Sequence, residues 1–249
     1  MTLSIASQAI CACYSGATMI TLRAAKERGH ANHGWLDSHH SFSFAGYYDP
    51  EHMGVSALRV INDDVVAAGA GFSTHSHSDM EIISYVLKGA LEHRDNMGNG
   101  SIIRPGEVQR MSAGSGISHS EYNASQTEQV NFLQIWIMPN QYGVEPGYAQ
   151  KDFTAELNDR LCLVASPDGR EGSLSIHADV LLYASRIKTD DVLQYPLQHG
   201  RTAYLHLATG EAIVNGVHIH GGDGITIKDE TAVEINTEQQ AELLLFDLP

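Results

Sequence analysis

Two short patterns contain the residue types best suited to chemistry, His75-x-His77 and, further along the chain, His119-x-Glu121. Residues i and i+2 of a β-strand project from the same face, roughly 6.5–7 Å apart. Two such strands facing each other inside a barrel would direct three imidazoles and one carboxylate to a single point. That donor set suits a first-row transition metal with open coordination positions, which distinguish a reactive metal site from a structural one.

The elements that would position these residues are predicted to be strands. Short alternating or apolar segments are separated by Gly, Asn, Asp and Pro, while long stretches of helical periodicity are scarce, which is typical of an all-β protein. Phe132–Met138 and Glu242–Asp247 are predicted strands, and Asn215-Gly216 is a strong hairpin signal. Asn62–Asp64 is predicted to be a turn that ends a strand over Ser56–Ile61.

The chain divides into two halves around the turn-rich segment Pro139–Thr154, which is predicted to be a linker. Each half has the length and strand density of a small barrel or sandwich. We expect an extension over residues 1–18, a metal-binding domain over 19–145 and a second domain over 146–249. The second half lacks a His-x-His followed by His-x-Glu, so no metal site is expected there.

Composition narrows the possible partners. The 249 residues include 15 Lys and Arg against 30 Asp and Glu, a formal net charge of −15, and no cluster of basic residues. Such a charge repels phosphate backbones and argues against direct nucleic-acid binding. No apolar run reaches the roughly 20 residues that span a bilayer, so no membrane span is expected. A monomer is compatible with the sequence.

The cysteines and the first residues indicate a cytoplasmic protein. Cys11, Cys13 and Cys162 do not make a disulfide framework, and reduced thiols are expected. Residues 1–18 contain no Lys or Arg, whereas a secretory signal begins with a positively charged region. The extension is therefore interpreted as disordered, or as preceding a natural start at Met19.

The segment around the first histidine pair closely matches the first motif of the cupins, which are small double-sheet jelly rolls with a metal in the barrel mouth. The match is Gly69-x5-His75-x-His77-x3-Glu81-x7-Gly89. In generic cupins the glutamate of this motif, here Glu81, is the fourth ligand. Glu121 competes for that role because it shares a strand face with His119. On the cupin pattern alone the fourth ligand is ambiguous.

A denser set of motifs resembles the pirin family, bicupin proteins whose bacterial members include quercetin 2,3-dioxygenases. The resemblance runs from about Met19 to the C-terminus. Its motifs are the segments 28–38, 40–44, 47–50, 58–64, 74–82, 111–123 and 133–139. It implies an all-β fold of two tandem cupin (jelly-roll-like) β-barrel domains. The family's metal ligands fall on His75, His77, His119 and Glu121, which would leave Glu81 a structural or supporting carboxylate.

The activity implied by the resemblance is flavonol ring opening with O2 and release of carbon monoxide, on a small aromatic substrate. One divalent transition metal would be the cofactor. Fe(II) is the expected ion, and Ni, Cu, Mn, Co or Zn are compatible with the same ligands. Glu121 would be the catalytic residue, taking the proton of the substrate's 3-hydroxyl as a general base.

Other functions stay open. Some pirin-like proteins resemble redox sensors that engage a protein partner when the metal changes oxidation state, and a cupin isomerase or sugar-binding module is a third class. Further histidines are interpreted as structural or incidental. They are the pair His218 and His220 after the hairpin turn, and the group His30, His33, His39 and His40.

Overall fold

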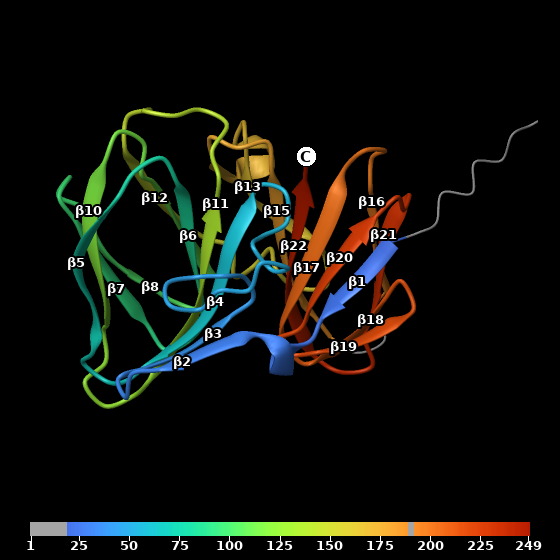
Figure 1. Cartoon of the computed structure of the whole chain (residues 1–249), viewed down its shortest axis with the longest axis horizontal. Coiled ribbons are helices and arrows are strands. Elements are labelled where there is room, and N and C mark those ends of the chain that lie inside the picture. Colours follow the sequence, from blue (N-terminus) through green and yellow to red (C-terminus); the bar gives the residue numbers. More distant parts are fainter. Residues whose placement is uncertain (1–18, 189–191) are drawn as a thin grey trace, which may run out of the picture.

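The computed structural model describes residues 19–188 and 192–249, and its elements form two β-barrels side by side (Figure 1). Cys11, Cys13 and the predicted extension lie outside the described residues. Within the described ranges, no helix is long and apolar enough to cross a membrane. Among the described residues, the helical segments are two short 3-10 helices, η1 (Ala25–Glu27) and η2 (Arg170–Gly172).

The first barrel consists of a seven-stranded and a four-stranded sheet. The larger sheet has the order β12 (Gly147–Asp152), β9 (Glu107–Ser112), β6 (Glu81–Lys88), β11 (Val130–Ile137), β4 (Leu58–Val66), β3 (Leu36–His40) and β2 (Gly29–Asn32). The smaller has the order β5 (Gly71–His77), β10 (Ile117–Asn123), β7 (Leu91–Asp95) and β8 (Gly100–Ile103).

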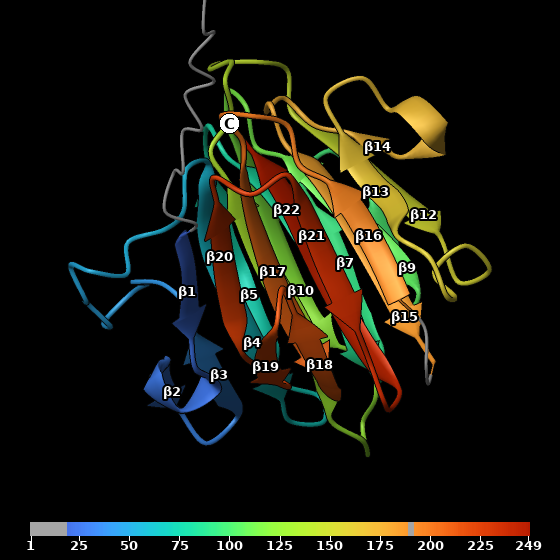
Figure 2. The same ribbon diagram turned by 90° about the vertical axis from the view of Figure 1, so that its right-hand side faces the viewer.

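The second barrel repeats this plan, and Figure 2 views it face-on. Its larger sheet has the order β1 (Met19–Arg23), β20 (Gly224–Lys228), β17 (Thr202–Thr209), β22 (Ala241–Leu248), β15 (Leu181–Ile187), β13 (Cys162–Ser166) and β14 (Leu174–Ser175). Its smaller sheet has the order β16 (Val192–Pro196), β21 (Ala232–Asn236), β18 (Glu211–Val214) and β19 (Val217–His220). The all-β prediction of two tandem cupin barrels is confirmed.

Two strands pair with a sheet of the domain other than the one to which the sequence assigned them. β1 pairs with β20 of the second barrel, and β12, which begins at residue 147, pairs with β9 of the first. The segment Pro139–Thr154 is thus not only a linker, because its last part completes the first barrel's larger sheet. A boundary between residues 145 and 146 stays a prediction.

Several predicted elements match the structure and one does not. Asn215 and Gly216 form the β18–β19 turn with positive φ values of 47° and 80°, as an Asn-Gly hairpin requires. The turn predicted at Asn62–Asp64 is wrong, because these residues continue β4. Tertiary partners outweigh their turn preference: Ser38 Oγ donates to Asp64 at 2.5 Å, and Arg28 pairs with Asp63 at 3.4 Å.

The two barrels have different interiors. The second barrel is filled by an apolar cluster that includes Leu205, Leu243 and Ile227. Another apolar cluster joins the barrels. It contains Tyr85 and Leu133 of the first barrel and Phe246 of the second. Two smaller apolar clusters belong to the first barrel itself, and its interior also holds buried polar side chains such as Ser84, His93 and Glu121.

Candidate metal centre

Three of the four predicted ligands converge in the first barrel. Strands β5 and β10 pair antiparallel, which sets His75 directly opposite His119, with His77 on the same face of β5. The ring centroids are 4.5 Å apart for His75 and His119, 4.8 Å for His75 and His77, and 5.0 Å for His77 and His119. One nitrogen of each imidazole lies within 4.8 Å of the others, close enough for a shared ion.

Glu121 lies beside this cluster, deeper in the barrel. The pairing of β10 with β5 shifts register between His119 and Glu121, so the carboxylate groups with His119 and His93 rather than with all three predicted imidazoles. Its oxygens accept hydrogen bonds from Ser84 Oγ at 2.9 Å and, at 3.4 Å, from the Gln134 amide. Burial raises the pKa of Glu121 despite these donors.

Glu81, the alternative fourth ligand, belongs to the opposite face of its sheet. It is three residues from Ser84 on β6, and side chains an odd number of residues apart in a strand point to opposite faces of the sheet. Its carboxylate accepts a hydrogen bond from Ser112 Oγ at 2.7 Å and one from the backbone of His177 in the second half of the chain. Glu81 therefore ties the barrels together and does not approach the histidine cluster.

The protonation of the imidazoles fits metal binding. Nδ1 of His75 lies 2.8 Å from the Ser73 carbonyl, which can only accept, so the lone pair is on Nε2. Burial, together with the neighbouring histidines, lowers the pKa of His77 to about 4 and that of His119 to about 3. Neutral imidazoles are the form that ligates metals. Nε2 of His119 is buried with no hydrogen-bond partner among the described residues, and a cation would satisfy it.

His93 was missed by the sequence reasoning. It lies on β7, fully buried, and its ring centroid is 5.2 Å from that of His119. The local signal is weak, because Leu91 is the one apolar residue among the alternating positions Leu91, His93 and Asp95 of this five-residue strand. The short strand between Gly89 and the next turn was not among the predicted elements.

An aromatic wall borders the cluster on the side of His77. Its ring packs edge-on to Trp136 of β11, with centroids 5.0 Å apart, and Trp136 packs edge-on to Phe44 at 5.3 Å. The contact with Trp136 connects Phe44 to the edge of the site.

Two further groups of histidines lie away from this cluster. His30, Asp37 and His39 lie on the edge strand β2 and its neighbour β3, with the His30 and His39 rings stacked 4.5 Å apart. His218 and His220 flank Glu211 at 3.7 Å and 3.6 Å on the exposed side of β19. Neither group is part of the buried cluster.

Two β-barrels, one packed with apolar residues and one with imidazoles and a carboxylate inside it, define a bicupin protein with a candidate site for a divalent metal. Comparison with known proteins gives the family. Residues 21–137 match the Pirin family model, and residues 163–248 match the model of the quercetinase C-terminal cupin domain. The chain belongs to the pirin family.

Individual relatives agree with this assignment. A protein of Escherichia coli K12 named quercetin 2,3-dioxygenase is 52% identical over 93% of this chain and 99% of its own. A pirin-like protein of Caulobacter vibrioides is 42% identical over 92% and 99%. The crystal structure of the bacterial pirin YhhW from E. coli in complex with nickel(II) superposes with a TM-score of 0.89, at 52% identity, over 93% of this chain and 99% of that one.

Proposed function

We propose that this protein is a metal-dependent ring-cleaving dioxygenase of the quercetin 2,3-dioxygenase type, which opens the heterocyclic ring of a flavonol with O2 and releases carbon monoxide. The observation that carries the proposal is the cluster of three imidazoles beside a buried carboxylate in one barrel. The name of the E. coli relative supports the reaction class at 52% identity.

The metal would be held by His75, His77, His119 and Glu121. The nickel complex of YhhW supports a divalent transition metal, and Fe(II) is our proposal for this chain because nitrogen and oxygen donors suit it. When bound, the metal supplies a Lewis acid for the substrate's anionic oxygen and a redox centre for O2.

Glu121 is suited to accept the proton of the flavonol 3-hydroxyl. A general base works best when its pKa is close to the operating pH, and burial moves the pKa of Glu121 upward in that direction. The hydrogen bonds from Ser84 and Gln134 fix the direction of its oxygens. The carboxylate is 1% exposed, so bulk water does not compete for the proton.

The aromatic wall is suited to a flat substrate. Trp136 and Phe44 border His77, and aromatic rings offer faces and edges against which a planar ring system can stack. A flavonol held in this way would direct its 3-hydroxyl toward Glu121.

The test is oxygen uptake and carbon monoxide release with quercetin by the iron-loaded protein and its Glu121→Gln variant. Glutamine keeps the size of the side chain and an oxygen for the Ser84 hydrogen bond but is not a base. We expect turnover to fall by about 10²–10⁴-fold, as for loss of a general base, with a much smaller fall in metal content.

The matched control is Glu81→Gln, which changes a buried carboxylate on the other face of the sheet and should leave the rate within a few-fold of wild type. Full activity of Glu121→Gln would exclude the base assignment. Absence of oxygen uptake by the metal-replete wild-type protein, on quercetin and on a panel of other flavonols, would exclude the dioxygenase.

A further inference from the structure

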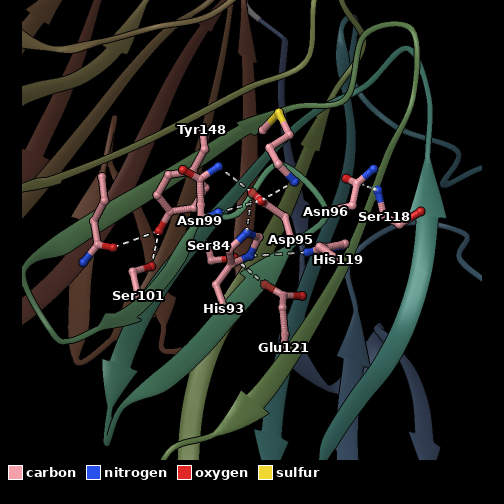
Figure 3. A network of polar contacts seen from close by, with 12 residues as sticks. Ser84, His93, Asp95, Asn96, Asn99, Ser101, Ser118, His119, Glu121 and Tyr148 are labelled. Carbon is pink, nitrogen blue, oxygen red and sulfur yellow. Dashed lines mark hydrogen bonds and ion pairs between the residues drawn. The ribbon is translucent and has the colours of Figure 1, made fainter.

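A second buried histidine, His93, contacts both His119 and the buried carboxylate of Asp95 (Figure 3). The Nδ1 atoms of His119 and His93 are 3.4 Å apart, and Nε2 of His93 is 3.3 Å from Oδ2 of Asp95. The side chains of His93 and Asp95 are completely buried, and His119 is 2% exposed. The three groups therefore interact with one another and not with solvent.

Asp95, the partner of His93, is a hydrogen-bond acceptor fixed by its own neighbours. Its Oδ1 accepts hydrogen bonds from the backbone amides of Met97 and Asn99, both at 3.0 Å, and its Oδ2 accepts one from the Asn99 side chain at 2.8 Å. Burial alone would raise the pKa of Asp95, but these hydrogen bonds and that from His93 outweigh it and lower the pKa. An ionised carboxylate can only accept.

The acceptor decides where the ring protons are. Because Asp95 only accepts, Nε2 of His93 carries a proton, and the neutral ring has its lone pair on Nδ1. That lone pair can accept the Nδ1 proton of His119. The lone pair of His119 is then on Nε2, the buried nitrogen with no hydrogen-bond partner among the described residues.

We propose that His93 and Asp95 are positioning residues, which fix the tautomer and orientation of His119 and so present its Nε2 to a divalent metal. This inference rests on the proposed function through the ligand set. Partners of this kind orient a metal-binding histidine and make it a stronger base. His93 is not itself a ligand, because both of its nitrogens are engaged.

The ring of Tyr148 packs against the ring of His93. The two rings lie 4.8 Å apart with an angle of 30° between them. Tyr148 comes from β12, the strand that crosses the predicted domain boundary, and its hydroxyl is hydrogen-bonded to Ser101 and Gln150. The 3.4 Å contact between the two histidines is long for a hydrogen bond, so we expect an effect near the lower end of the range for such partners.

The experiment is a competition for Ni²⁺ between the metal-stripped full-length protein and a chromophoric chelator. Loss of an outer partner of a ligand weakens metal affinity by about 10–100-fold, and for His93→Leu we expect a loss near tenfold. His93→Asn retains an acceptor near the Nδ1 position but packs less well than leucine. Affinity higher in His93→Asn than in His93→Leu therefore indicates hydrogen bonding rather than packing.

Two further variants separate the possible failures. Leu91→Ala, on the same strand and face, removes packing but no hydrogen-bonding atom, and should bind Ni²⁺ as wild type does. His119→Ala should lose Ni²⁺ binding. Wild-type affinity of His93→Leu beside a metal-free His119→Ala would overturn the positioning role and leave the ligand set intact, whereas wild-type affinity of His119→Ala would overturn both.

A second readout needs no metal and no activity. Nitrogen-15 NMR of the imidazoles in the metal-free protein reports which nitrogen carries the proton. We expect His119 protonated on Nδ1 and His93 protonated on Nε2, and a mixture of His119 tautomers in His93→Leu. A wild-type His119 protonated on Nε2 would overturn the inference, whatever the affinities.

Discussion

The donors of the candidate site are oriented by neighbours that are neutral or that accept hydrogen bonds. The Ser73 carbonyl fixes His75, and Ser84 with Gln134 fixes Glu121. Such neighbours choose a tautomer or a direction without adding a positive charge that would repel a cation. Burial also lowers the pKa of His77 and His119 and so keeps these two imidazoles neutral.

Ser84 tests how far these neighbours tune the proposed base. A hydrogen bond donated to a carboxylate stabilises its charged form and lowers its pKa, so Ser84→Ala should raise the pKa of Glu121 further. The base is active when deprotonated. The acid limb of the kcat/KM profile with quercetin should therefore move to higher pH, with activity lost earlier as the pH falls. A pH–rate series on both proteins measures this shift.

Ser185 offers the matched control for Ser84. It is also fully buried, but its hydroxyl has no hydrogen-bond partner among the described residues. Ser185→Ala should leave the pH profile unchanged, with stability equal to or slightly above that of wild type, since it removes an unsatisfied group. An unmoved acid limb in Ser84→Ala would argue that this hydroxyl does not tune the base.

At the scale of elements, the strand period accounts for what the sequence could predict. The spacing of i and i+2 predicted that His75 and His77 share a strand face, and the structure pairs that strand with the one bearing His119. The step of Glu121 away from the imidazoles comes from a register shift, which no local pattern encodes. Asn62–Asp64 was mispredicted for a similar reason, because its partners Ser38 and Arg28 are distant in sequence.

The β5–β10 pair carries all four proposed ligands and depends on a close backbone approach at Gly71. A Cβ there would lie 2.5 Å from Cα of Tyr122 and even closer to the carbonyl oxygen of Glu121. Gly71→Ala should push the strands apart, lower the free energy of unfolding by about 1–3 kcal/mol, as overpacking does, and weaken Ni²⁺ binding. Denaturant titration and chelator competition measure the two effects.

Gly100 on β8 is the control for this substitution. An added Cβ there would meet nothing within 4 Å, so Gly100→Ala should match wild type in both measurements. Wild-type stability and Ni²⁺ affinity in Gly71→Ala would mean that β5 and β10 can adjust their spacing without moving the ligands.

At the scale of the whole molecule, the first barrel contains the candidate metal site and the second barrel contains an apolar core. The second barrel encloses an apolar cluster, and a further cluster of residues from both barrels joins them. Strands β1 and β12 add to this connection, since each completes a sheet of the other half. The polar interior of the first barrel costs stability, and the extended apolar contact with its neighbour offsets that cost.

The buried His206 of β17 predicts how the stability of the molecule depends on pH. It is fully buried, both ring nitrogens lack hydrogen-bond partners among the described residues, and burial lowers its pKa to about 4. Arg28 lowers the pKa further, while Asp63 and Asp223 oppose it. Between pH 6.5 and about 4 the unfolded chain binds a proton that the folded chain does not, so the free energy of unfolding falls as the pH falls.

His206→Leu should remove this acid sensitivity and the unsatisfied nitrogens together. With about 1.4 kcal/mol for each unit of pKa shift, the variant should gain roughly 2–4 kcal/mol over wild type on going from pH 7 to pH 4. Urea unfolding of both metal-free proteins across this range measures the difference. His218→Leu, at an exposed position of the same barrel, controls for loss of a histidine as such. Parallel pH curves for wild type and His206→Leu would mean that His206 becomes protonated in the folded barrel as readily as in the unfolded chain.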